Sequence, residues 1–294
     1  MTQVQDFWTW PESLWQSKDI DWRGAGKLTA GIDVGTTSTQ AVVLADGEVF
    51  AYSNIATGYC IGKAGERALS AALEGTGLEA AGIQATAATG FGAERVENAD
   101  KQIDEITCHA KGGRFIFGPS VSTVVDIGGQ TVKAIRLYDW DRVRDFIIND
   151  KCATGMGRSI ELMCDILQVP VTEIGGKSLE VEKDPETVSH TCYSFANPEV
   201  VGLFRQGFKE DAYSENEVLA AYMFTIAWRV IGTISKMQPL DVGDVKVYEP
   251  IAFTGGLALN SGITKRIERE LNFTSLSADI NPMLAGAIGA ALLA

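Results

Sequence analysis

Histidine and basic residues are scarce in this sequence, and each scarcity excludes a class of function. The two histidines, His109 and His190, are too few and too far apart for a zinc site or a nucleophile constellation, so we treat both as structural. With 25 basic against 38 acidic residues, the net charge is −13, which disfavours general attraction to nucleic-acid phosphates. We therefore expect no nucleic-acid partner.

Signals for export, membrane insertion and disulfide bonding are also lacking. The opening segment MTQVQDFWTWPESLWQ has neither the basic start nor the apolar stretch of a signal peptide, and no run reaches the roughly 18 apolar residues of a membrane span. The cysteines are odd in number and have no secretory context, which favours reduced thiols or metal ligands; they are Cys60, Cys108, Cys152, Cys164 and Cys192. We expect a cytoplasmic protein without a membrane partner.

Length and periodicity favour a two-lobed α/β fold. The 294 residues are enough for two separate cores, and a hydrophobic fraction of 46% is ordinary for a globular protein. A strand ending in aspartate, a glycine turn and a returning strand occur at Asp33 and again at Asp126, as in a duplicated fold. We divide the chain into a Trp-rich N-terminal arm (1–27), a first lobe (28–118) and a second lobe (119–280), with a C-terminal helix (281–294) that returns to the first lobe.

The N-terminal arm holds four of the six tryptophans, ahead of any periodic pattern: Trp8, Trp10, Trp15 and Trp22. Two interpretations stay open. The rings pack on the chain's own body, or they hold a partner, because Trp is enriched at interface hot spots.

Both aspartate turns carry the groups that phosphate binding requires. Backbone N–H groups of a glycine turn and neighbouring hydroxyls can approach phosphate oxygens, while the aspartate holds hydrated magnesium. We predict a triphosphate between the lobes, with Asp33 and Asp126 on the metal side and Gln130 orienting the attacking water. The predicted phosphate contacts are Gly35, Thr36, Thr37, Ser38, Gly128 and Gly129.

A third glycine turn ends a later strand and precedes a helix containing Asn260. We predict that Gly255, Gly256 and Asn260 form the surface against which an adenosine lies. No GxxxxGK[ST] motif is present in the sequence, which disfavours a P-loop NTPase.

Cys152 and Cys192 each precede a predicted helix start. After Cys192, Asn197 is predicted as the N-cap, Pro198 as the first helical residue and Glu199 as a first-turn acid. Helix N-termini favour thiolates and anionic clusters, although free buried cysteines remain the alternative. Two cysteines cannot hold a 4Fe–4S cluster, but two such pairs across a twofold axis supply four thiolates, so a cluster would require a dimer.

The sequence resembles the BadF/BadG/BcrA/BcrD ATPase family, within the superfamily of acetate kinase, sugar kinases, Hsp70 and actin. The likeness runs from Ala30 to Ala294 and is carried by GIDVGTTST, ATGFG, ADKQIDEITCHAKG, VVDIGGQTVK, NDKCATGMGR, TCYSFANPEV, FTGGLALN and AGAIGAALLA. It implies a two-lobed actin-like ATPase (duplicated ribonuclease H-like) fold with MgATP in the cleft between the lobes. Lys151, in NDKCATGMGR, joins the expected cofactor-binding residues.

The resemblance also implies a mechanism, because members of this family use ATP hydrolysis to drive one low-potential electron uphill. Cys152 and Cys192 would ligate a 4Fe–4S cluster bridging to a homologous ATPase subunit that supplies the other two cysteines. Ferredoxin is the expected electron donor, and catalytic acyl-CoA reductase subunits are the expected acceptor.

Three departures from the family pattern bear on the acceptor. Gln40 stands where many relatives have lysine, Thr131 where many dehydratase activators have aspartate, and Asn197 where they have glutamate. Together with the N-terminal arm, these changes favour one subunit of a heterodimeric ATPase of class I benzoyl-CoA reductase, similar to the Q-type subunit of the Bzd-type enzyme, in anaerobic aromatic degradation.

Three other functions stay open at this stage. An activator of a 2-hydroxyacyl-CoA dehydratase would have the same chemistry. A sugar kinase shares the first phosphate turn, but the sequence offers no convincing carboxylate base. A non-catalytic, ATP-gated regulator is compatible with the three departures.

Overall fold

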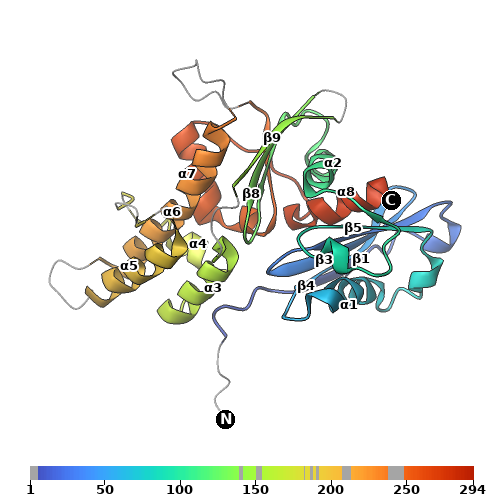
Figure 1. The fold of residues 1–294 in the computed structure, drawn as a ribbon, viewed down its shortest axis with the longest axis horizontal. Helices are drawn as coiled ribbons and strands as arrows, with labels where there is room; N and C mark the ends of the chain where they lie inside the picture. Colours follow the sequence, from blue (N-terminus) through green and yellow to red (C-terminus); the bar gives the residue numbers. More distant parts are fainter. Residues whose placement is uncertain are drawn as a thin grey trace, which may run out of the picture.

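The computed structural model of the chain describes residues 6–138, 142–149, 154–181, 183–185, 188–189, 192–206, 213–237 and 248–294. Lys151, Cys152 and His190, named above, lie outside these ranges. The described residues form a mixed α/β molecule with one sheet at one end, a group of helices at the other and a second sheet between them (Figure 1).

The first sheet contains six strands in the order β1-β4-β3-β2-β5-β6. β2 pairs antiparallel with β3 and parallel with β5, and the β3–β4 hairpin turns at Asp46 and Gly47, both with positive φ. That turn confirms the Asp-Gly hairpin signal. The strands are β1 (Ser13–Gln16), β2 (Leu28–Val34), β3 (Ser38–Ala45), β4 (Glu48–Ala56), β5 (Ala85–Thr89) and β6 (Lys101–Gln102).

The second sheet repeats the central strand order of the first. It contains β7 (Thr123–Ile127), β8 (Val132–Leu137), β9 (Val143–Asn149) and β10 (Ile251–Thr254), in the order β10-β7-β8-β9. β7 pairs antiparallel with β8 and parallel with β10, as β2 does with β3 and β5. The order β4-β3-β2-β5 thus matches β9-β8-β7-β10, and the expected duplicated fold is confirmed.

Helices cover both faces of the first sheet. Side chains along β3 alternate between these two faces, so neighbouring residues of the strand pack against different helices. Ala41 packs with residues of α1 (Ile61–Leu73), and Val42 and Leu44 pack with residues of α8 (Ala285–Leu293). α2 (Glu105–Phe117) packs against α8 and also contacts the second sheet, so these two helices join the lobes (Figure 1).

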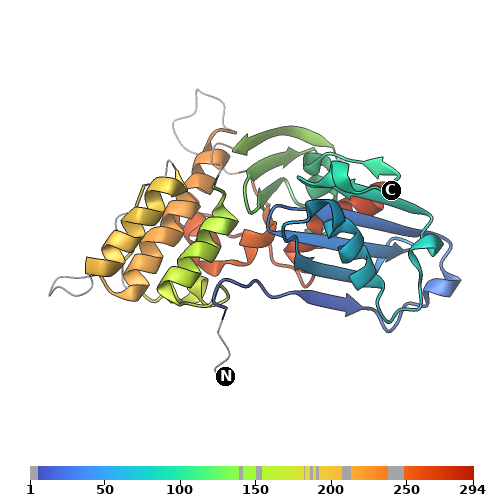
Figure 2. The same ribbon diagram turned by 60° about the horizontal axis from the view of Figure 1, so that its bottom comes forward.

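The core of the second lobe lies between its sheet and a helical group at the far end of the molecule (Figure 2). The helices of this group are α3 (Met156–Leu167), α4 (Ile174–Lys177), α5 (Tyr193–Gln206), α6 (Glu215–Ser235) and α7 (Ser261–Leu271). Short 3-10 turns lie at Trp22–Gly24, Ala80–Gly82, Ala93–Arg95, Gly256–Leu259 and Pro282–Leu284.

The predicted start of the helix after Cys192 is wrong. α5 begins at Tyr193, so Asn197 is not its N-cap and Pro198 lies inside the helix. Tyr193 and Ala196 are buried in the second-lobe core, and this tertiary packing outweighs the local start signal. Cys192 therefore lies immediately before the helix.

α6 is long and apolar enough to cross a membrane by length and composition, and it is the one such helix within the described ranges. However, 72% of its apolar window is buried inside the protein. Its apolar residues belong to the second-lobe core, which explains their composition.

Candidate nucleotide site

The two aspartate turns occupy equivalent positions in the two sheets. Asp33 lies in β2 and Asp126 in β7, and both side chains are buried. Each turn closes with the same backbone hydrogen bond, from Gly35 N to Ser38 O at 3.1 Å and from Gly128 N to Thr131 O at 3.0 Å. The duplicated fold therefore presents two matching Asp–Gly turns.

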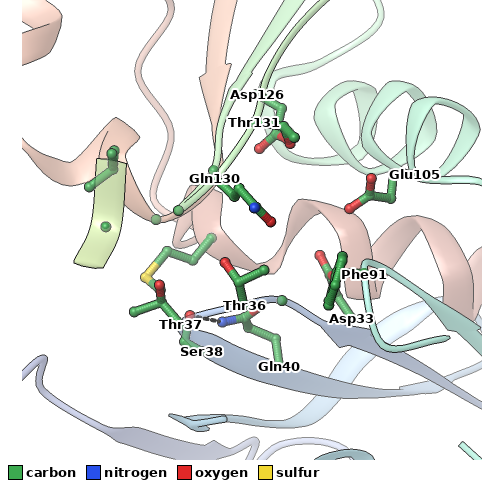
Figure 3. Close-up of a pocket in the computed structure, with 18 of the residues that line it drawn as sticks. Asp33, Thr36, Thr37, Ser38, Gln40, Phe91, Glu105, Asp126, Gln130 and Thr131 are labelled. Atoms are coloured by element: carbon green, nitrogen blue, oxygen red, sulfur yellow. Dashed lines mark hydrogen bonds between the residues drawn. The ribbon is translucent and has the colours of Figure 1, made fainter. Parts of the chain in front are cut away.

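A cavity separates the two turns. It contains about 860 Å³ of empty space, its open mouth included. Figure 3 shows Gln130 extending into the space between the turns. Most of the site residues predicted from sequence line this cavity. They are Asp33, Gly35, Thr36, Thr37, Ser38, Asp126, Gly128, Gly129, Gln130, Gly255 and Gly256.

Thr37 shows that the site is suited to an oxygen-rich ligand. Its Oγ1 is buried and has no hydrogen-bond partner within the described part of the chain. The space around this hydroxyl is narrow. A Cβ on Gly129 of the second turn would lie 2.7 Å from Thr37 Oγ1, and a Cβ on Gly157 of α3 would lie 2.8 Å from the same atom. Hydroxyl and backbone groups without bulky side chains fit the phosphates of ATP.

Three titratable residues from outside the turns enter the cavity. His109 Nε2, on α2, lies 3.8 Å from Asp33 Oδ2 and 3.6 Å from Asp126 Oδ2, while its Nδ1 lies 3.1 Å from Thr254 Oγ1. Lys133 Nζ, on β8, donates to Asp126 Oδ2 at 2.7 Å and lies 3.4 Å from Glu105 Oε2. The two carboxylates predicted to hold magnesium therefore share one buried cluster with two basic side chains.

Burial controls the ionisation of this cluster. It raises the pKa of Asp33 to about 6; His109 opposes the shift, and Glu105 and Asp126 add to it. Burial would lower the pKa of Lys133, but Asp126 and Glu105 outweigh it and raise that pKa above its usual value. Lys133 is thus held as a cation, whereas Asp33 ionises only above about pH 6.

The third glycine turn also lies at the cavity. Gly255 follows β10 with φ of 85°, and a Cβ there would lie 2.3 Å from Asp126 Oδ1. Gly90 follows β5 with φ of 88° and approaches Asp33 Oδ1 equally closely, so these two glycines are also equivalent. Asn260 does not line the cavity; it is the N-cap of α7, and its Oδ1 accepts from Ile263 N at 3.2 Å.

The three departures from the family pattern have defined partners. Gln40 donates to Ser38 Oγ at 2.8 Å and to Asn54 Oδ1 at 2.7 Å, and it lines the cavity without a charge. Thr131 Oγ1 accepts from Lys133 Nζ at 2.9 Å. Asn197 Oδ1 accepts from Ser159 Oγ at 2.7 Å, away from the cavity.

Sequence reasoning missed His109, Glu105 and Lys133. A usable signal was present, because Glu105 and His109 are four residues apart after the N-cap Asp104 and so share one helix face. Treating His109 as merely structural overlooked that α2 projects this face toward both aspartates.

Of the two cysteines predicted to bind a cluster, one can be described. Cys192 is half-buried against the second-lobe core, at the start of α5, with its thiol free. A thiol at a helix N-terminus suits an anionic cluster. Within the described ranges, no group of three or more potential ligands forms a metal site.

Comparison with known proteins identifies the relatives of this fold and site. The chain is 35% identical over 268 residues to the 2-hydroxyisocaproyl-CoA dehydratase activator of Clostridioides difficile, covering 90% of this chain and 94% of the relative. It is 38% identical over 275 residues to the (R)-2-hydroxyglutaryl-CoA dehydratase activating ATPase of Acidaminococcus fermentans, covering 90% and 96%. A benzoyl-CoA reductase subunit of Thauera aromatica is 28% identical over 281 residues, covering 90% and 92%.

The solved structures agree with these relatives. The activator of the 2-hydroxyisocaproyl-CoA dehydratase from Clostridium difficile, with bound ADPNP, superposes with a TM-score of 0.80 at 33% identity, covering 91% of this chain and 94% of that one. The two-lobed actin-like ATPase fold is therefore confirmed, and ATP binding at a site of this kind is supported. A model of the BadF/BadG/BcrA/BcrD ATPase family matches residues 30–294, and the chain belongs to that family.

Proposed function

We propose that this protein is an ATP-hydrolysing activator that delivers a low-potential electron to an enzyme of the 2-hydroxyacyl-CoA dehydratase type. The observation that carries the proposal is the cavity between two equivalent Asp–Gly turns, which is lined by Thr37 with its buried, unpartnered hydroxyl. The identities of 35% and 38% to dehydratase activators support the choice of partner.

The acceptor proposed here differs from the one expected from sequence. The benzoyl-CoA reductase relative is less similar, at 28% identity, than the dehydratase activators. The changes at Gln40, Thr131 and Asn197 favour a reductase when only the sequence is considered, yet each side chain has a local hydrogen-bond partner. They therefore give no reason to prefer the reductase.

The residues of the cavity have distinct roles in nucleotide binding. Gly35 and Gly128 begin turns whose N–H groups and hydroxyls would hold the phosphates, and Gln130 would orient the attacking water. Asp33 and Asp126 would hold hydrated magnesium, with His109 between them. Lys133 limits the excess negative charge beside Asp126 before any nucleotide binds.

The adenosine side of the site is assigned to the third turn. Gly255 and Gly256 line the cavity where β10 ends, so a ring can approach the backbone closely. Asn260 would act indirectly, by fixing the start of α7. The cofactor-binding role of Lys151 stays a prediction, because this residue lies outside the described ranges.

Electron transfer is assigned to Cys152, which lies outside the described ranges, and to Cys192, which lies near the start of α3 because Ser194 Oγ is 2.9 Å from Thr154 Oγ1. A 4Fe–4S cluster held by Cys152 and Cys192, with two cysteines of a second copy or a homologous subunit, would supply one-electron chemistry at low potential. α3 connects the two regions within this chain, because Gly157 in its first turn lines the nucleotide cavity and Ser159 donates to Asn197 on α5. Movement of α3 upon ATP hydrolysis would thus reach the helix that follows Cys192.

The test is anaerobic reconstitution of the purified protein with two acceptors. One is a 2-hydroxyacyl-CoA dehydratase and the other is the catalytic module of a benzoyl-CoA reductase, each supplied with reduced ferredoxin and MgATP. We expect ATP-dependent reduction of the dehydratase. Turnover with the reductase alone would overturn the proposed acceptor.

Cysteine variants test the cluster in the same preparation. Iron, acid-labile sulfide and low-temperature EPR should show a cluster in the wild type that is lost in Cys152→Ser and in Cys192→Ser. Cys60→Ser is the matched control because Cys60 is exposed and lies in the first lobe. A wild-type protein without iron would contradict electron activation.

A further inference from the structure

The N-terminal arm lies ahead of residues 30–294, which the family model matches, and its role is not explained by the proposed function. Two segments of the arm attach to different lobes. Figure 2 shows the arm running from the helical group across to the edge of the first sheet.

The later attachment is to the first lobe. β1 pairs antiparallel with β4, with Ser13 opposite Asn54 and Gln16 opposite Ala51. Just before β1, Glu12 Oε1 accepts from Ala56 N at 2.8 Å, and Pro11 O accepts from Asn54 Nδ2 at 3.3 Å.

The earlier attachment is to the second lobe. Phe7 O accepts from Val171 N at 2.9 Å, and Phe7 and Trp10 pack against the second-lobe core. Trp10 Nε1 donates to Glu161 Oε1 at 2.9 Å. Glu161 is a buried residue of α3 whose other oxygen accepts from Arg158 Nη1 at 2.6 Å.

The connection between these attachments is short and passes the nucleotide cavity. The chain from Phe7 to Glu12 can span at most about 17 Å when fully extended. Trp10 itself lines the cavity. The arm also reaches the first phosphate turn, because Asn54, which donates to Pro11 O, accepts from Gln40, which in turn donates to Ser38.

We propose that residues 7–16 form an interlobe strap and that Trp10 is its positioning residue, which holds α3 against the first lobe across the nucleotide cavity. Opening of the cavity beyond the length of the strap would break the Trp10–Glu161 or the Phe7–Val171 hydrogen bond. The strap therefore slows nucleotide release. This inference rests on the proposed function only in that a nucleotide fills the cavity.

The test compares two tryptophan variants that each lose one indole hydrogen bond. Trp10→Phe removes the bond between the lobes, whereas Trp22→Phe removes the bond to Thr76 O, which lies inside the first lobe. The protein is loaded with Mg²⁺ and a fluorescent N-methylanthraniloyl-ADP and chased with excess ATP in a stopped-flow instrument. We expect release at least about tenfold faster in Trp10→Phe, as the loss of a bond to a charged acceptor predicts, and within about twofold of wild type in Trp22→Phe.

A second measurement needs no nucleotide. Hydrogen exchange at the Val171 amide reports the neighbouring strap contact directly, and it should accelerate in Trp10→Phe but not in Trp22→Phe. Glu161→Gln keeps the shape of the acceptor but not its charge, so it should accelerate nucleotide release and Val171 exchange to a smaller extent. This variant serves as the test if Trp10→Phe fails to fold.

The outcomes that contradict each idea are distinguishable. Unchanged release and unchanged Val171 exchange in Trp10→Phe would overturn the strap. A wild-type protein that binds no labelled nucleotide would overturn the proposed function, and the exchange measurement would still decide whether the strap exists.

Discussion

At the scale of single residues, the buried cluster around Asp33 and Asp126 decides how the cleft responds to pH. Asp33 is surrounded by protein, and its pKa is raised to about 6 from an ordinary value of 3.8. Since the unfolded chain loses this proton more readily, ionised Asp33 costs folding free energy above about pH 6. That cost disappears as the pH falls toward 3.8.

Asp33→Asn should therefore stabilise the nucleotide-free protein in a pH-dependent manner. A difference of about two pKa units corresponds to up to about 3 kcal/mol in the free energy of unfolding at about pH 8. The variant and the wild type should have equal stability near pH 4. Urea unfolding at the two pH values measures this difference, and an equal gain at both would contradict the assignment.

His109 connects the two aspartates, so its replacement should impair ATP turnover more than folding. In His109→Phe the ring volume is retained, but the nitrogens facing Asp33, Asp126 and Thr254 are lost. We expect a fall in kcat for ATP of about tenfold or more, in the range typical of lost positioning groups. The measurement is steady-state ATPase activity over a series of Mg²⁺ concentrations, and a normal kcat would refute this role.

At the scale of elements, the contact between α2 and α8 depends on glycines. A Cβ on Gly112 would lie 1.8 Å from Ala285 O, and one on Gly289 would lie 1.9 Å from Cys108 O. Both neighbours are backbone oxygens, so no side-chain rotation can relieve the overlap. The helices that join the lobes thus touch backbone to backbone.

Gly112→Ala should destabilise the protein by about 3 kcal/mol or more, because overpacking here displaces a whole helix. The matched control is Gly232→Ala in α6, where a Cβ would meet nothing within 4 Å. The control should gain about 0.5 to 1 kcal/mol from better helix propensity. Equal melting behaviour of the two variants would show that the α2–α8 contact is not tight.

The individual strands and turns can be predicted from sequence, whereas the tertiary contacts between elements cannot. The hairpin at Asp46 and the repeated strands ending near Asp33 and Asp126 follow from turn chemistry and periodicity within a few residues. The predicted start of α5 is wrong because burial of Tyr193, a tertiary effect, extends the helix past the local signal at Asn197.

In the candidate site, too, some residues can be predicted from sequence and others cannot. Both phosphate turns are readable as motifs and line one cavity. The role of His109 is not readable, because its position between the aspartates depends on α2 packing against α8, and the two helices are far apart in sequence. The arm is similarly ambiguous in sequence; in the structure Trp10, Trp15 and Trp22 contact the chain's own body, and Trp8 is 42% exposed.

At the scale of the whole molecule, nucleotide binding should stabilise both lobes together, because the cavity takes residues from each. MgATP at about one hundred times its Kd should add about 2.7 kcal/mol. For a chain of this length, that corresponds to a rise of about 4 °C in Tm. Differential scanning fluorimetry measures the shift.

Gly129→Ala should abolish this shift while leaving the Tm without nucleotide close to that of the wild type. The added Cβ would lie 2.7 Å from Thr37 Oγ1 and 3.2 Å from Thr36 Oγ1, so the two hydroxyls predicted to contact phosphate must shift. An unchanged nucleotide-induced shift would show that the two turns do not close on one ligand.

The place of α8 in the chain has a consequence for synthesis on the ribosome. β2 is among the first strands to be translated, yet α8, the last helix of the sequence, covers its sheet and lies against Asp33 at Gly286. A nascent chain therefore exposes an apolar sheet face until translation is almost complete, and ATP cannot assist its folding. Products of premature termination would lack a finished nucleotide site and present that face to chaperones and proteases.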